Sequence, residues 1–214
     1  MIMIGPPGAG KGTQAERVAA ERGVPKISTG DILREAIHQG NPLGLRAKST
    51  VEQGELVRDD LIIGIVKERL NRPDARQGFV LDGFPRTVVQ AKALDEILAG
   101  RDPLIIVEIV VPHDELVRRM TSRRICGECG ATAGSADAKC RLCGGELVLR
   151  SDDGNSEVMD RRLQIYAQQT EPIVNYYRKR PTFRSIDGTQ TPDRVADAMA
   201  AAIDSALETT RSSS

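Results

Sequence analysis

The chain has 214 residues, of which 40% are hydrophobic and 28% are charged, and its formal net charge is zero. This size and composition suit one soluble α/β domain with insertions. The neutral charge balance disfavours a nucleic-acid partner, which needs an excess of Lys and Arg, and no window approaches the roughly 20 apolar residues of a membrane span.

Strand and helix signals alternate along the chain. Short apolar runs predict strands at residues 1–4, 24–27, 79–81, 104–111 and 183–186. Helical spacing predicts helices at residues 13–22, 30–39, 43–53, 60–71, 87–99, 114–122, 157–180 and 192–209. Pro172 predicts a kink or break in the longest helix. The alternation predicts a five-stranded parallel sheet flanked by helices, with ligands bound beyond the carboxyl ends of the strands.

The segment GPPGAGKGT, residues 5–13, lies between the first predicted strand and the first predicted helix. Its glycines allow backbone N–H groups to turn inward, the helix N-terminus attracts anions, and Lys11 adds a positive charge. The general phosphate-loop pattern has Ser or Thr after the lysine, whereas this chain has Gly12 and then Thr13. We predict a phosphate site, because an ordinary glycine turn does not account for Lys11.

Two further segments follow predicted strands. In LDGFPRTVVQ, Asp82 occupies the place where phosphate-loop proteins often carry a magnesium-associated carboxylate, and Arg86 follows in a turn. In STGDILR, Thr29 and Arg34 flank a helix start that suits an anion. Taken alone, each segment also fits a plain strand exit or a helix cap.

All four cysteines lie in two C-x-x-C pairs separated by ten residues, at Cys126, Cys129, Cys140 and Cys143. Four thiolates in this arrangement can hold one tetrahedral Zn²⁺ with no open position, so we predict a structural zinc site in an inserted subdomain. The chain starts with an apolar run too short for a signal peptide, which predicts a cytoplasmic protein. Reduced thiols in the cytoplasm favour metal over disulfides, and a redox dithiol is the alternative.

Arginines bracket the Cys segment at Arg119, Arg123, Arg124, Arg150, Arg161 and Arg162. They are either solvated helix faces or cations that a closing lid brings over a phosphate site. Phosphoryl transfer depends on such charges, since one arginine can contribute about 10³–10⁵ in rate.

The motifs GPPGAGKGTQ, ISTGDILR, GELV, LDGFPRT with Gln90, SRRIC, RSDD followed by Arg162, and IDGT occur together and in this order. In this set the chain resembles adenylate kinase, in the branch with a long zinc-bearing lid. The resemblance implies the reaction ATP + AMP = 2 ADP, with Mg²⁺, in a monomer. Gly12 followed by Thr13 is the form that this family has.

The resemblance also implies a P-loop three-layer α/β sandwich with two mobile inserts. The core would comprise residues 1–28, 58–121 and 157–214, the AMP-binding insert residues 29–57, and the lid residues 122–156. Implied ATP-binding residues are Gly8, Ala9, Gly10, Lys11, Gly12, Thr13, Arg119, Arg123 and Gln190. Implied AMP-binding residues are Thr29, Arg34, Glu55, Leu56, Val57, Gly83, Phe84, Pro85, Arg86, Gln90, Arg150 and Arg162.

Within these sets, the residues implied to be catalytic are Lys11, Arg86, Arg119, Arg123, Arg150 and Arg162. Gln90 would recognise adenine, and Asp82 would hold Mg²⁺ through water. Arg161 is the rival of Arg162 for the active-site position, because the segment before it is one residue longer than the family's form.

The lid departs from the family in its shorter gap between the cysteine pairs and in Ala133, where relatives often carry an aromatic residue. We therefore expect weaker ATP binding than in a relative with the full lid. Two alternative functions stay open at this point. One is a kinase for UMP, CMP or GMP, and the other is a nucleotide-binding module whose zinc ribbon binds nucleic acid.

Overall fold

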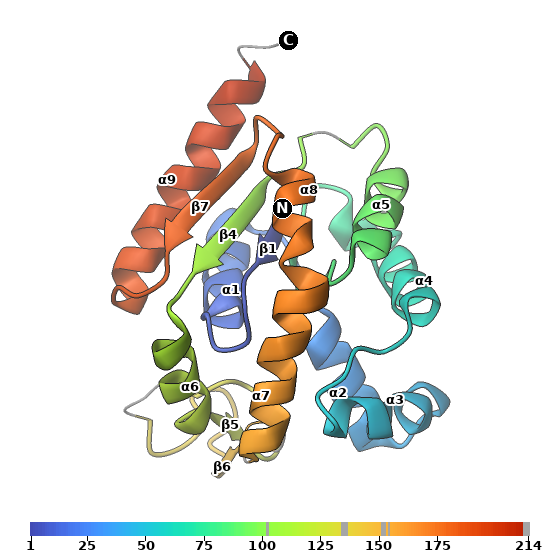
Figure 1. Cartoon of the computed structure of the whole chain (residues 1–214), viewed down its shortest axis with the longest axis vertical. Helices are drawn as coiled ribbons and strands as arrows, with labels where there is room; N and C mark the ends of the chain where they lie inside the picture. Colours follow the sequence, from blue (N-terminus) through green and yellow to red (C-terminus); the bar gives the residue numbers. More distant parts are fainter. Residues whose placement is uncertain (102, 134–136, 151–152, 154, 212–214) are drawn as a thin grey trace.

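Five parallel strands form the central sheet of the computed structural model, in the order β2-β3-β1-β4-β7 (Figure 1). The structure describes residues 1–101, 103–133, 137–150, 153 and 155–211, so Ser151 and Asp152 of the RSDD motif lie outside it. The strands are β1 (Ile2–Ile4), β2 (Lys26–Ser28), β3 (Val80–Asp82), β4 (Ile106–Val110) and β7 (Phe183–Asp187). The five-stranded parallel sheet expected from the sequence is confirmed.

Helices cover both faces of this sheet, as the alternating pattern predicted (Figure 1). They are α1 (Lys11–Arg22), α2 (Thr29–Gln39), α3 (Pro42–Glu52), α4 (Asp59–Leu70), α5 (Val88–Ile97), α6 (His113–Thr121), α7 (Ser156–Ile165), α8 (Pro172–Tyr177) and α9 (Pro192–Arg211), with a short 3₁₀ turn at Pro73–Ala75. Side chains alternate across β1, so Ile2 and Ile4 join the cluster under α4, α5 and α8. Met3 joins the opposite cluster, under α1, α6 and α9.

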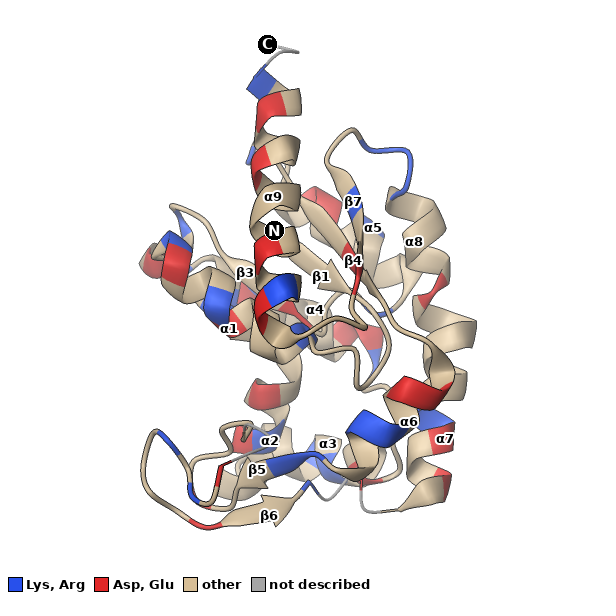
Figure 2. Ribbon diagram, turned by 90° about the vertical axis from the view of Figure 1, so that its left-hand side faces the viewer, with Lys and Arg blue, Asp and Glu red and all other residues tan. Residues whose placement is uncertain are grey.

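Two segments project from the sheet at the same end of the molecule (Figures 1 and 2). One is the helical pair α2 and α3, and the other carries a two-stranded antiparallel sheet of β5 (Arg124–Cys126) and β6 (Leu147–Leu149). These two strands were not among those predicted from the sequence. Each has only three residues, which is too short for an alternating pattern to be read.

The long helix predicted at residues 157–180 is divided. A π-helical turn, Tyr166–Thr170, separates α7 from α8, and Pro172 opens α8. Proline cannot donate a backbone hydrogen bond to the preceding turn, so the helix widens before it. The expected break is therefore present. Among the described residues, no helix combines the length and apolar character that a membrane span needs.

Candidate active site

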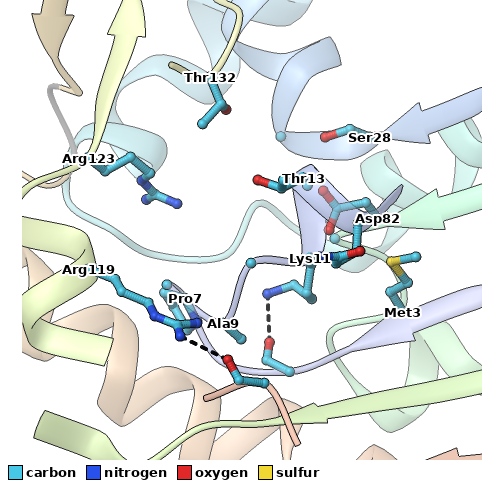
Figure 3. A pocket seen from close by; sticks show the side chains of 18 of the residues that line it. Met3, Pro7, Ala9, Lys11, Thr13, Ser28, Asp82, Arg119, Arg123 and Thr132 are labelled. Atoms are coloured by element: carbon cyan, nitrogen blue, oxygen red, sulfur yellow. Dashed lines mark hydrogen bonds between the residues drawn. The ribbon is translucent and has the colours of Figure 1, made fainter. Parts of the chain in front are cut away.

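A cavity of about 680 Å³ opens at the carboxyl ends of the parallel strands. The loop after β1, Ser28 at the end of β2 and Asp82 at the end of β3 all line it, as the topology predicted (Figure 3). Arg119 and Arg123 face the same space from the segment that leads into the lid (Figure 3). The cavity therefore brings cations from distant parts of the chain to one place.

Lys11 lies at the centre of the glycine loop. Its Nζ donates hydrogen bonds to the carbonyl oxygens of Gly5 at 2.7 Å and Pro6 at 2.9 Å. Burial lowers the pKa of Lys11 to about 7, while Asp82 opposes the shift and Arg86 adds to it. A phosphate beside this amine would favour its charged form, so the loop has the electrostatics of an anion site.

Glu115 fixes the guanidinium of Arg119 and was missed by the sequence analysis. Arg119 Nε donates to Glu115 Oε1 at 2.7 Å, and its Nη2 donates to the Gly188 carbonyl at 2.8 Å. Hydrogen bonds from Arg118 and Arg119 lower the pKa of Glu115 to about 2. The i,i+4 spacing of Glu115 and Arg119 on α6 is a signal that could have revealed the pair.

Asp153 ends the RSDD motif but was assigned no role from the sequence, and it connects two of the predicted arginines. Arg123 Nε donates to Asp153 Oδ2 at 2.6 Å, and Arg162 forms an ion pair with Oδ1. The Asp153 side chain is 2% exposed. Among the described residues, Arg123 Nη2 is a buried nitrogen without an aligned hydrogen-bond acceptor, although it lies 2.5 Å from Asp153 Oδ2.

A smaller cavity of about 70 Å³ adjoins the first, and Arg34, Gly83, Arg86, Arg150 and Arg162 line both. The Gly83 carbonyl accepts hydrogen bonds from Thr29 Oγ1 and from Arg86 Nε, both at 2.8 Å. Burial and the nearby Arg162 lower the pKa of Arg86 to about 10, so it keeps its charge at neutral pH. The charged groups are thus concentrated where the two cavities meet.

Gln90 lies on the wall of the smaller cavity and is 2% exposed. Its Oε1 accepts from the Arg86 backbone N–H at 2.7 Å, and its Nε2 donates to Asp59 Oδ1 at 2.7 Å. Asp59 was not anticipated, because it lies 31 residues away and no local spacing links the two. An amide has two donors and two acceptor positions, so one of each remains for a ligand.

With one exception, the residues that the resemblance implied for nucleotide binding line one of these two cavities. The exception is Phe84, which is 0% exposed and packs in the core cluster under α4 and α5. Arg162, 13% exposed, lines both cavities, whereas Arg161 lies outside them and pairs with Glu55. Thr132 and Ala133 line the larger cavity from the lid.

The four cysteines meet at one point of the lid. Their Sγ atoms all lie within 4.8 Å of one another, and the Cys126–Cys143 and Cys129–Cys140 pairs are 3.4 Å and 3.5 Å apart. A tetrahedral zinc with Zn–S bonds near 2.3 Å needs sulfur atoms about 3.8 Å apart. Backbone N–H groups of Cys143 and Leu142 lower the pKa of the Cys140 thiol to about 6. The cluster therefore suits zinc.

Comparison with known proteins adds an independent finding. A family model described as adenylate kinase matches residues 3–182. The adenylate kinase of Archaeoglobus fulgidus is 50% identical over 198 residues, which is 89% of this chain and 91% of the relative. The adenylate kinase of Thermodesulfovibrio yellowstonii is 44% identical over 212 residues, covering 95% and 98%. The adenylate kinase of Moorella thermoacetica is 48% identical over 198 residues, covering 89% and 91%.

Proposed function

We propose, from the premise that this chain belongs to the adenylate kinase family, that its two adjoining cavities hold ATP and AMP with their phosphates facing each other. The enzyme catalyses the reversible reaction ATP + AMP = 2 ADP and uses Mg²⁺. The observation that carries the assignment of the cavities is the concentration of Arg86, Arg150 and Arg162 where the two meet. Together with Arg34, which also lines both cavities, these cations match the charge of two phosphate groups brought together.

In this proposal the glycine loop binds the β- and γ-phosphates of ATP. Lys11 releases its contacts with the Gly5 and Pro6 carbonyls and binds the phosphate oxygens in their place. Arg119, held in a fixed plane by Glu115 and Gly188, would face the transferred phosphoryl group, as the resemblance implied. Gln190 lines the same cavity and would lie near the adenine ring of ATP.

AMP would extend from the smaller cavity into the adjoining part of the larger one, with Arg34 and Arg86 on its phosphate and Gln90 on its adenine. Thr29, Leu56, Val57 and Gly83 line the same cavity and would complete the AMP site. An oxygen of the AMP phosphate attacks the γ-phosphorus, and the bond from that phosphorus to the bridging oxygen of ADP breaks. No general base is needed, because the attacking oxygen is already an anion. Arg123, Arg150 and Arg162 would balance the charge that spreads over the transferred group.

Mg²⁺ neutralises charge on the β- and γ-phosphates when it is bound. Asp82 fits the role of a ligand that acts through water, because it ends β3 at the cavity wall beside Lys11 (Figure 3). Zn²⁺ would be held by Cys126, Cys129, Cys140 and Cys143, and would have a structural role only, since four thiolates leave no open position.

The domains follow the same assignment. Residues 1–28, 58–121 and 157–214 form the core, residues 29–57 the AMP-binding insert and residues 122–156 the lid. The inserts lie at one end of the molecule, where closure would exclude water from the transferring phosphoryl group (Figure 1). We propose a monomer in the cytoplasm, a compartment in which free cysteines such as these four persist.

A coupled assay that follows ADP formed from ATP and AMP, with and without Mg²⁺, tests the assignment. We expect ADP only when both nucleotides and the metal are present. A panel of UMP, CMP and GMP as acceptors tests the selectivity, and a faster rate with any of them would overturn the AMP assignment.

A further inference from the structure

A tight turn joins α3 to α4 in the proposed AMP-binding insert. Gly54 has a φ of 72°, a left-handed conformation that favours glycine. Backbone hydrogen bonds tie the turn to the end of α3, from Gly54 N–H to Val51 O at 3.1 Å and from Glu55 N–H to Thr50 O at 3.0 Å. The direction in which Glu55 leaves the backbone is therefore set by α3.

This turn packs directly on α7, about a hundred residues further along the chain. A Cβ atom on Gly54 would lie 2.8 Å from Arg162 Cγ and 3.0 Å from Val158 Cγ1. It would also lie 3.1 Å from the Val158 carbonyl oxygen, which belongs to backbone and cannot swing aside. The backbone of the turn thus touches the helix at a distance that only glycine permits.

An ion pair spans the same contact. Arg161 Nη2 donates to Glu55 Oε1 at 2.7 Å, and the two side chains are 54% and 41% exposed. Arg161 and Arg162 are adjacent on α7 but have different partners. Arg162 lines the two cavities and pairs with Asp153, whereas Arg161 lines neither cavity and pairs with Glu55 of the turn.

We propose that Arg161 is a positioning residue for AMP, which acts by holding Glu55 and with it the turn at residues 54–56 against α7. The turn supplies Glu55 and Leu56 to the wall of the smaller cavity, and Val57 follows at once. Holding the turn in place therefore orders this wall before AMP binds. This lowers the entropy that is lost when the insert closes. The inference rests on the proposed assignment of residues 29–57 as the AMP-binding insert.

The test measures KM for AMP and KM for ATP separately, in Arg161→Gln and Glu55→Gln. We expect KM for AMP to rise about two- to fivefold in each, the range that a partly exposed ion pair can supply, with KM for ATP unchanged. The difference from the unmodified enzyme should shrink in high salt. In the charge-swapped protein, Glu55→Arg with Arg161→Glu, KM for AMP should return most of the way to its unmodified value. Damage to the fold of either single variant would not be reversed in this way.

Arg22→Gln is the matched control, because Arg22 Nη2 also forms a partly exposed ion pair, at 2.7 Å from Asp204, and neither of these two residues lines a cavity. It should leave both KM values unchanged. Normal KM for AMP in the two single variants, or no recovery on charge swap, would overturn the positioning role. A rise confined to KM for ATP would instead overturn the assignment of the insert, so the two failures are distinguishable.

Discussion

Arg123 Nε donates a 2.6 Å hydrogen bond to Asp153 Oδ2, although the two residues are 30 positions apart in the chain. Arg123 follows α6 and Asp153 precedes α7, so the contact closes the base of the lid. The other oxygen of the same carboxylate pairs with Arg162 on α7. One acidic side chain therefore sets the spacing of two cations that line the larger cavity.

Replacing Asp153 by Asn keeps the shape of the side chain and removes its charge. Two buried or partly buried arginines then repel each other, so we expect kcat to fall at least about tenfold and the melting temperature to fall, since breaking such a pair is costly. The coupled ADP assay and a thermal melt measure the two effects. Asp160→Asn, at an exposed position of α7, is the control and should change neither. An unchanged kcat in Asp153→Asn would show that the arginines do not need this carboxylate.

ATP binding should take up a proton at about pH 8. The pKa of Lys11 is lowered to about 7 by burial, below its ordinary value of 10.5, so the amine is mostly neutral at that pH. A triphosphate favours the charged amine and raises its pKa again, so affinity falls as pH rises above about 7. Titration calorimetry with a non-hydrolysable ATP analogue, in buffers of different ionisation enthalpy, measures the uptake. In Lys11→Met the uptake should vanish, and equal uptake in both proteins would assign the proton elsewhere.

Removing zinc should unfold the lid and spare the core. The two core clusters contain no residue between Cys126 and Cys143 among those described, so at the proposed zinc site metal–thiolate bonds would take the place of hydrophobic packing. We expect Cys140→Ser, or treatment with a strong chelator, to abolish activity while the cooperative melt of the sheet is retained. Elemental analysis gives the metal content. A protein that holds no metal and melts identically with chelator would contradict a structural zinc site.

Gln90→Leu should weaken the discrimination of AMP from other nucleoside monophosphates. The change leaves Asp59 without the 2.7 Å hydrogen bond from the amide and removes the remaining donor and acceptor at the cavity wall. We expect KM for AMP to rise about tenfold or more, while KM for ATP stays constant, because unpaired buried polar groups cost roughly 1–3 kcal/mol. Kinetics with AMP and GMP measure the ratio. A rise in both KM values would mean that the substitution disturbs the whole site.

Ala133→Tyr should strengthen ATP binding. Ala133 lines the larger cavity from the lid, and an aromatic ring there can stack on adenine. Base–aromatic stacking is worth about 1–3 kcal/mol, so we expect KM for ATP to fall at least about fivefold with KM for AMP unchanged. Ala133→Leu, apolar but not aromatic, separates stacking from simple filling of space. No improvement with Tyr would count against stacking at this position.

Local signals predicted most of the fold. The strands β1, β3, β4 and β7 could be predicted because a parallel strand that is buried on both faces has a nearly continuous run of apolar residues. Helix α1 begins at Lys11, two residues before the predicted start. The earlier start was missed because glycine has a low helix propensity and the segment was interpreted as a loop. Cavity-lining residues could be predicted from the sequence where they belong to glycine-rich or arginine-containing motifs.

The carboxylates that hold the cavity-lining side chains were harder to predict. Asp153 and Asp59 meet their partners across 30 and 31 residues of chain, so only the folded structure brings each pair together. Glu115 is different, because its distance of four residues from Arg119 is visible in the sequence. A partner could therefore be predicted only where both residues lie on one helix, because the spacing along the sequence then fixes the contact.

The hydrogen bonds from Lys11 to the Gly5 and Pro6 carbonyls have a consequence for the thermodynamics of recognition. They cross-link the two ends of the glycine loop from within, and the Ala9 N–H adds a further bond to Pro6 O at 3.2 Å. A glycine-rich segment would otherwise lose much conformational entropy when a phosphate ordered it. Here that entropy is lost when the protein folds. Nucleotide binding then exchanges the two carbonyl contacts of Lys11 for contacts with phosphate, and the backbone of the loop has little further entropy to lose.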